Sequence, residues 1–221
     1  MSTSLRIKFS RTGPVKYLGH LDMMRYFQKA VMRSGIDVRY SEGFNPHQIM
    51  SFAYPLGVSM ETYGDYMDID VNTFESPEKI TEMLNNVMHE GVEIVATYVL
   101  PDGALNAMAS VYAADYDVEL DCNVSKEEID KLLSNNELIV TKEGKKGPVS
   151  KDIKPGIFEL TAENNILYMK VKSGSTLNIK PSDIVDLLSQ SSGQNYKIIQ
   201  ITRKETYRLN ENDKIVSLGE F

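Results

Sequence analysis

The 221-residue sequence predicts an α+β protein made of two tandem ferredoxin-like (split βαβ) units with antiparallel sheets. Strand-type segments with alternating apolar and polar residues are interleaved with amphipathic helical segments. Each half of the chain shows the order strand, helix, two or more strands, helix, strand. A Pro-Asp-Gly turn at 101–103 begins the connection between the halves. We therefore expect domains at 1–105 and 106–221.

The first half begins with a strand and an amphipathic helix. Residues 5–10 alternate with period two, which predicts a half-buried strand. Over 18–34, apolar residues recur at helical spacing and charged residues follow the opposite stripe, so a helix is expected that ends at Gly35. Ser76 is an N-cap candidate followed by proline, and it predicts a second helix that runs to about residue 89. The other expected strands are 36–40, 47–56, 63–71 and 92–100.

The second half repeats this order. Ser125 with Glu128 three residues later has the spacing of a capping box, which predicts a helix at 125–133. A second helix at 181–189 follows Lys180, which offers no side-chain cap. The expected strands are 111–120, 137–141, 157–161, 166–171 and 196–203, the third and fourth forming a hairpin.

Composition and motifs exclude several classes of protein. With 42% hydrophobic and 25% charged residues, the chain has the composition of an ordinary globular protein. A single cysteine excludes an intramolecular disulfide framework and metal sites that need several thiolates. No phosphate-binding, dinucleotide-binding, zinc-peptidase or nucleophile-elbow motif is present, and we expect no cofactor and no metal. Because no segment resembles a signal peptide or a membrane span, we expect the chain in the reducing cytoplasm.

Charge is distributed unevenly along the chain, which has a net charge of −7. Residues 1–48 carry 8 Lys and Arg against 3 Asp and Glu, residues 49–138 carry 3 against 18, and residues 139–221 carry 13 against 10. An acidic protein is a poor general nucleic-acid binder, but a local basic face can bind phosphate when the acidic face points away. The alternative is that the acidic middle block is simply a solvated surface.

The segment 40–47 between two expected strands holds the densest group of unusual residues. Gly43 permits a positive φ and Asn45-Pro46 favours a turn, so a loop is expected here. Aromatic side chains can stack on nucleic-acid bases while neighbouring cationic side chains bind the phosphates. The alternative is a structural loop whose Phe44 fills the core. The candidate substrate-binding residues are His20, Arg25, Lys29, Tyr40, Ser41, Gly43, Phe44, Asn45, Pro46 and His47.

His20 stands at the start of the first helix, where free N–H groups favour an anion. If His20 is already helical, Arg25 and Lys29 point about 140° and 180° away from it, so a shared site requires His20 outside the regular helix. A capping or packing role is the alternative. His20 and His47 also have the side chains of an acid and base pair for RNA cleavage, provided that they lie close together.

A second basic stretch lies in the second half. Its glycine and proline residues favour a solvated hairpin, and contact with phosphate is the alternative. The lysines are Lys142, Lys145, Lys146, Lys151 and Lys154.

Two segments carry a resemblance to a known family. The motifs are KYLGHLD at 16–22 and YSEGFNPH at 40–47, followed by Ile49, SFA at 51–53 and PLG at 55–57. Over about residues 4–72 the chain resembles the radical SAM-linked protein family, a domain of unknown function encoded beside, or fused to, radical SAM proteins with a cobalamin-binding domain. The resemblance implies a radical SAM protein as partner. The chain itself lacks the cysteines that bind the iron–sulfur cluster of such an enzyme.

The sequence thus leads to three hypotheses about function. The first is a non-catalytic accessory module that binds substrate, expected to be RNA, for a radical SAM enzyme. A layout similar to that of CRISPR-associated RNA-processing proteins with tandem ferredoxin-like domains adds fold analogy to this view. The second is a protein–protein adaptor that docks through the acidic middle block. The third is a metal-independent endoribonuclease.

Overall fold

The computed structural model describes residues 2–144 and 147–221, so the predicted basic-stretch residues Lys145 and Lys146 lie outside the described residues. The chain divides into two compact units: the first is Met1–Tyr112 with Glu205–Phe221, and the second is Ala113–Lys204. The expected α+β class with antiparallel sheets is confirmed. In contrast to the expected domain at 106–221, the last residues of the chain belong to the first unit.

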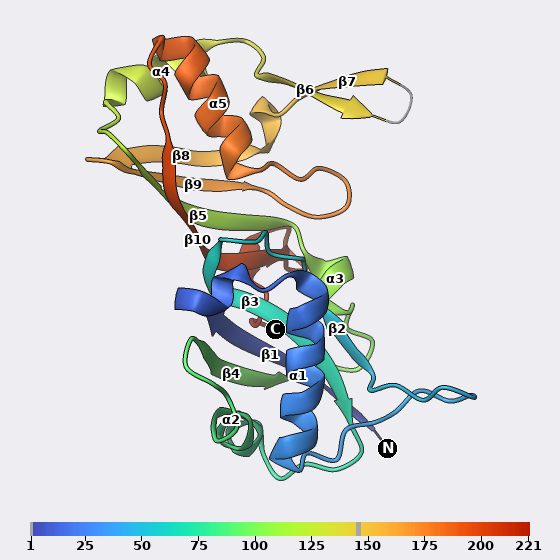
Figure 1. Cartoon of the computed structure of the whole chain (residues 1–221). Helices are drawn as coiled ribbons and strands as arrows, with labels where there is room; N and C mark the ends of the chain where they lie inside the picture. Colours follow the sequence, from blue (N-terminus) through green and yellow to red (C-terminus); the bar gives the residue numbers. More distant parts are fainter. Residues whose placement is uncertain (1, 145–146) are drawn as a thin grey trace. The chain divides into compact units, whose positions relative to one another are not determined.

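The first unit has a sheet with the strand order β4-β1-β3, and β2 pairs with β3. All pairings between these strands are antiparallel. The strands are β1 (Thr3–Arg11), β2 (Met50–Phe52), β3 (Glu61–Val71) and β4 (Val92–Val99), and the helices are η1 (Gly13–Tyr17), α1 (His20–Ser34), α2 (Pro77–Asn85) and α3 (Ala107–Ser110). Figure 1 shows α1 lying across this sheet and α2 beside β4.

Both long helices of the first unit form where the sequence predicts them. Gly35 ends α1 with φ 75°, the left-handed conformation that glycine adopts without strain. The Ser76 side chain caps α2 by accepting a hydrogen bond from the Lys79 N–H at 3.2 Å. The inward faces of both helices pack on the apolar side of β1 and β3 in one core. Its fully buried residues include Leu5, Ile7, Phe27, Val31, Met67 and Leu84.

The two strands predicted at 36–40 and 47–56 are mostly irregular in the structure. Val38 and Tyr40 form only isolated bridges, and β2 is three residues long. The chain turns away from the sheet at Gly43, where φ is 110°, and Pro46 has no N–H to donate to a strand ladder. The predicted strand ladder therefore stops on both sides of the turn.

The second unit has the strand order β10-β5-β9-β8. Its elements include β5 (Ala113–Leu120), α4 (Lys126–Ser134), η2 (Lys154–Gly156), β8 (Ile157–Glu163), β9 (Ile166–Lys172), α5 (Pro181–Ser192) and the first part of β10 (Ile198–Leu209). The hairpin predicted around Asn164 is confirmed by the antiparallel pairing of β8 with β9. Lys142 and Lys151 of the second basic stretch lie on β6 (Ile139–Gly144) and β7 (Gly147–Asp152), which form a separate two-stranded antiparallel sheet.

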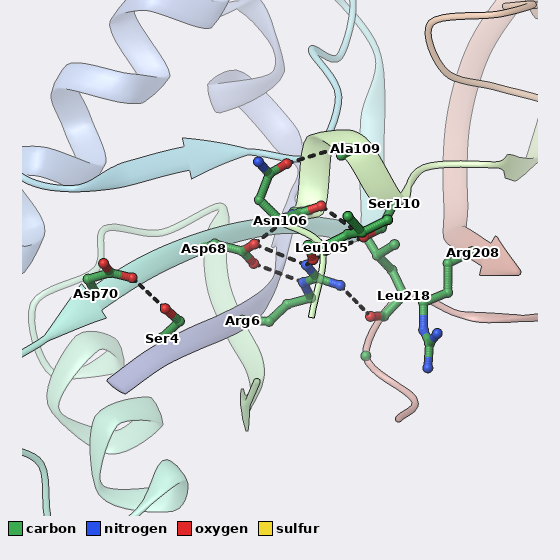
Figure 2. Close-up of polar contacts among 12 residues, drawn as sticks. Ser4, Arg6, Asp68, Asp70, Leu105, Asn106, Ala109, Ser110, Arg208 and Leu218 are labelled. Carbon is green, nitrogen blue, oxygen red and sulfur yellow. Dashed lines mark hydrogen bonds and ion pairs between the residues drawn. The ribbon is translucent and has the colours of Figure 1, made fainter. Parts of the chain in front are cut away.

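The second sheet face of the first unit is covered by chain segments from far along the sequence. Arg6 of β1 is fully buried and forms a bidentate ion pair with Asp68 of β3, at 2.8 and 3.0 Å. Its guanidinium also donates to the Leu218 carbonyl at 3.1 Å and to the Leu105 carbonyl at 3.0 Å, as Figure 2 shows. This network holds the C-terminal segment, including β11 (Ile215–Ser217), in the first unit.

A second, partly buried network adds to this attachment. Glu205, the first residue of the returning segment, accepts hydrogen bonds from Tyr66 at 2.8 Å and Lys8 at 2.5 Å. Burial, together with the Glu205 charge, raises the pKa of the Tyr66 phenol far above its usual value. Tyr66 therefore stays a neutral hydrogen-bond donor within this network.

Candidate functional site

Residues 40–47 form a loop, here called the 40–47 loop, whose two ends are held together by backbone hydrogen bonds. The Ser41 N–H donates to the His47 carbonyl at 2.8 Å, and the Ile49 N–H donates to the Arg39 carbonyl at 2.9 Å. Tyr40 and Gln48 form an isolated antiparallel bridge. Figure 1 shows this segment, drawn in blue beside β2, extending away from the rest of the first unit.

Side chains within the 40–47 loop also contact one another. The His47 N–H donates to Ser41 Oγ at 3.1 Å, and Ser41 Oγ lies 2.8 Å from His47 Nδ1. Because Ser41 Oγ already accepts from a backbone N–H, its own hydroxyl hydrogen can be donated to Nδ1. The Asn45 carbonyl lies at 3.4 Å from the same Nδ1.

Phe44 is fully exposed within the 40–47 loop. The alternative in which Phe44 fills the core is therefore wrong. Tyr40, at the base of the loop, is 45% exposed. An exposed phenylalanine on a loop that is tied by its own hydrogen bonds is available for stacking against another molecule.

The loop base is anchored to α1 through Gln48. This residue is 5% exposed, and its amide Nε2 donates to the Gln28 carbonyl at 3.1 Å. Lys29, the next residue of α1, is exposed. Arg25 lies one turn earlier on the helix and is 68% exposed, with only an i,i+3 ion pair to Asp22 at 3.5 Å. A pair this exposed contributes little, so the guanidinium can leave it for a phosphate.

His20 does not share a site with these two cations. It is the first residue of α1, so it has the helical geometry that directs Arg25 and Lys29 to other sides of the helix. Its ring packs edge-on against Phe52, with centroids 5.5 Å apart. The contacts of His20 and His47 thus involve different residues, and the structure shows no contact that joins the two rings as an acid and base pair.

The described lysines of the second basic stretch are engaged with their own unit. Lys142 forms an ion pair with Asp183 at 2.6 Å, and Lys151 donates to the Thr176 carbonyl at 3.1 Å. Lys154 donates to the Asn135 carbonyl. These contacts tie the stretch to neighbouring segments of the second unit, and they favour the hairpin interpretation over contact with phosphate.

Among the described residues, few other side chains could bind a metal or react as a nucleophile. Within residues 2–144 and 147–221, no group of three or more His, Cys, Asp or Glu side chains is placed to hold a metal ion. Desolvation, reinforced by neighbouring Asp121, raises the pKa of the Cys122 thiol, which lowers its reactivity. In the same part of the chain, no helix combines the length and the apolar character needed to cross a membrane.

Sequence reasoning identified the 40–47 loop but missed Gln48. A buried glutamine is unusual, and its role depends on a carbonyl 20 residues away on α1. Periodicity assigns Gln48 to an expected strand and carries no signal for a side chain that fastens a loop to a helix.

The chain belongs to the family described as "Uncharacterized protein conserved in bacteria (DUF2344)", which matches residues 4–181. This match includes the whole candidate site. No curated protein matches the chain.

Among solved structures, the chain is similar to one titled "Crystal Structure of a Cbf5-Nop10-Gar1 Complex", with 8% sequence identity and a TM-score of 0.48. The match covers 91% of this chain and 48% of that chain, so this chain spans about half the length of the one that it matches. At this level of similarity, the match carries no functional argument.

Proposed function

We propose that this protein is a non-catalytic, cytoplasmic RNA-binding module that works with a radical SAM enzyme. The observation that carries the RNA-binding proposal is the complete exposure of Phe44 on a loop held by its own hydrogen bonds. Stacking of one base on an aromatic ring contributes about 1–3 kcal/mol and does not depend strongly on sequence. The radical SAM partner is inferred from the family resemblance of residues 4–72. The 40–47 loop and α1 are the elements that bind RNA in this proposal.

Electrostatics support RNA over a neutral ligand. The loop base meets α1 beside Lys29, and Arg25 lies one turn earlier, so the helix that anchors the loop carries two exposed cations. Both belong to the basic block 1–48. Long flexible cations of this kind bind phosphate as point charges or through bidentate contacts.

We also propose that each unit is a ferredoxin-like split βαβ. Each unit has the chain order strand, helix, strand, strand, helix, strand once the β6–β7 hairpin is set aside. In the sheet orders β4-β1-β3-β2 and β10-β5-β9-β8, the first strand of this series lies between the fourth and the third, as in a split βαβ unit. In the second unit, the β6–β7 hairpin is then an insertion after α4.

The test is a fluorescence anisotropy titration of the full chain with a short labelled single-stranded RNA and a labelled RNA hairpin. We expect Phe44→Ala to weaken binding by about 5- to 150-fold, the loss of one stacked base. Phe158→Ala is the matched control, since Phe158 is a partly exposed phenylalanine of the second unit. Equal affinity of wild type and Phe44→Ala would refute the proposed role of the loop.

Salt dependence tests the cations separately. The logarithm of the binding constant is plotted against the logarithm of the salt concentration between about 50 and 200 mM. The magnitude of the slope should fall by about 0.7 for each phosphate contact that is removed from a single strand. An Arg25→Ala, Lys29→Ala double variant should therefore lower the slope by about 1.4. An unchanged slope would remove α1 from the interface. RNA turnover in the same samples would overturn the non-catalytic assignment.

The partnership is tested by co-purification of this chain with a radical SAM protein encoded beside it. We expect a stoichiometric complex, or enhanced delivery of bound RNA to that enzyme. If the chain binds the enzyme but no RNA at low salt, and charge reversals in the block 49–138 abolish the complex, the adaptor hypothesis replaces this proposal.

A further inference from the structure

The first unit contains a cavity that the proposed RNA site does not use. Its volume is about 540 Å³, within the range of roughly 300–1,000 Å³ that is typical of small-molecule sites. It lies where the start of β1, β2 and the C-terminal part of β3 meet the segment that follows β4. Hydroxyl and carboxylate side chains line it together with an apolar wall, and its polar residues are Ser2, Thr3, Ser4, Ser51, Asp68, Asp70, Asp102 and Asn106.

The carboxylates in this cavity differ in their pairing. Asp68 is neutralised by its bidentate ion pair with Arg6, and it also accepts from the Ala107 N–H at 2.6 Å. Asp70, two residues along the same strand, accepts from the Ser4 hydroxyl at 2.7 Å, and among residues 2–144 and 147–221 its side chain has no ion pair. Figure 2 shows Asp70 facing Ser4, apart from the group around Arg6.

The remaining charges at the cavity are also negative. Asp102 is exposed, and no described lysine, arginine or histidine forms an ion pair with it. No lysine, arginine or histidine is present among the described residues that line the cavity. The neighbouring cation is Arg39, whose guanidinium donates to Ser2 Oγ at 2.9 Å. Among the described residues that line the cavity, Asp70 and Asp102 therefore leave a net negative charge, which disfavours phosphate and carboxylate ligands.

These groups select a ligand by its chemistry. A carboxylate and hydroxyl oxygens accept hydrogen bonds from an ammonium group, and such charge-assisted bonds are the strong ones. Methylene groups suit the apolar wall, which includes Met50, Val99 and Leu100. We propose that this cavity binds a small aliphatic di- or polyamine, with one ammonium group on Asp70 and another toward Asp102.

Calorimetric titration of the full chain with putrescine tests this proposal. We expect saturable binding at one site, with no heat of binding from 1,4-butanediol, which has the same carbon chain with hydroxyls in place of ammonium groups. Asp70→Asn should weaken putrescine binding by about 10-fold or more, as for the loss of a hydrogen bond to a charged group. Asp130→Asn, which removes an exposed carboxylate of α4, is the matched control and should bind like wild type.

A second variant makes the test independent of any effect of Asp70→Asn on folding. Asp102→Asn should weaken binding of putrescine while leaving that of butylamine, which has a single ammonium group, unchanged. No binding of putrescine at low salt would overturn the proposal. Equal weakening by Asp130→Asn would also overturn it, because the amine would then only be attracted to an acidic protein.

The amine site and the proposed RNA site can fail separately. Phe44→Ala should retain putrescine binding, and Asp70→Asn should retain RNA binding. A lysine side chain from another protein offers the same ammonium chemistry, so Nα-acetyl-lysine amide is a further probe. If it binds at Asp70 and putrescine does not, the free diamine is the wrong ligand.

Discussion

The two units differ in the burial of the sheet face that their long helices do not cover. In the first unit, Arg6, Tyr66 and Asp68 on this face are all buried. In the second unit, the corresponding face carries Asp117 and Lys170 with intermediate exposure around a hollow of about 240 Å³. Strands in both units alternate in the same way, so the pattern of polar residues is similar while the environment is not.

The difference shows what burial requires of a polar side chain. In the first unit, the buried Arg6 charge is paired with Asp68 of β3, and the covering segments supply the Leu105 and Leu218 carbonyls as further acceptors. In the second unit, Asp117 pairs with Lys204 at 3.0 Å while both side chains stay partly exposed. Buried ions need complete pairing, whereas exposed ones are solvated by water.

The largest expected effect comes from breaking the buried pair of the first unit. Asp68→Asn leaves the Arg6 charge buried without its partner, and we expect the free energy of unfolding to fall by about 3–5 kcal/mol. Asp117→Asn in the second unit should change it by less than about 1 kcal/mol. Chemical denaturation of both variants measures the contrast.

A matched control lies on the same strand as Asp68. Asp70→Asn weakens only the bond from Ser4 and should cost about 0.5–1.5 kcal/mol. Similar losses for Asp68→Asn and Asp117→Asn would show that the two sheet faces do not differ energetically. A double variant with apolar residues in place of Arg6 and Asp68 should recover much of the loss, because the cost arises from the orphaned charge.

The second prediction concerns the apolar part of the same covering segment. Leu218 is fully buried against Ala53, Tyr66 and Ala107, so Leu218→Ala should destabilise the first unit by about 2–5 kcal/mol. Hydrogen exchange should rise in β1 and β3 and stay unchanged in α5. Phe221→Ala is the control, because this partly exposed ring only covers guanidinium groups and its loss should cost about 1 kcal/mol. Equal exchange across both units after Leu218→Ala would contradict the division into units.

Local signals predicted the helices of both units well. Ser76 and the Ser125–Glu128 spacing mark the helix starts, and Gly35 marks a helix end, because caps depend on neighbours a few residues away. The return of the C-terminal segment was not predicted. Alternation in β1 assigns Arg6 to the polar face of the strand, but it cannot tell whether water or a distant segment covers that face.

The candidate site likewise combines features that the local sequence predicts with features that depend on tertiary packing. Gly43 and the Asn45-Pro46 pair predicted a loop from local backbone chemistry. The exposure of Phe44 and the anchoring by Gln48 depend on tertiary packing, and so does the separation of His20 from the cations of α1. The cavity near Asp70 is lined by residues 2–4 and 99–104 among others, which are far apart in the sequence, so no local pattern predicts it.

The third prediction concerns a helix start in the second unit. In α4, Ser125 Oγ accepts from the Glu128 N–H at 3.3 Å while Glu128 accepts from the Ser125 N–H at 2.9 Å. Ser125→Ala removes one half of this capping box and should cost about 1 kcal/mol. Ser125→Asn keeps a neutral acceptor and should restore most of it. A full loss in Ser125→Asn would show that the hydroxyl, which also donates to Glu128 at 2.9 Å, is required beyond its role as an acceptor.

The smallest effect is a pH dependence confined to the second unit. Hydrogen bonds from the Ser125 backbone, and then from Tyr196 at 2.7 Å, lower the pKa of the Glu128 carboxyl below its usual value of 4.5. Because the folded state favours the carboxylate, its contribution to stability is present above about pH 4.5 and is lost as the pH falls through the lowered pKa. In Glu128→Gln, unfolding measured from pH 6 down to pH 3 should show a flatter decline than in wild type. Glu127→Gln removes a neighbouring charge in the same helical turn and should keep the wild-type slope, so an equal flattening in both variants would assign the effect to the helix dipole instead of the hydrogen bonds on Glu128.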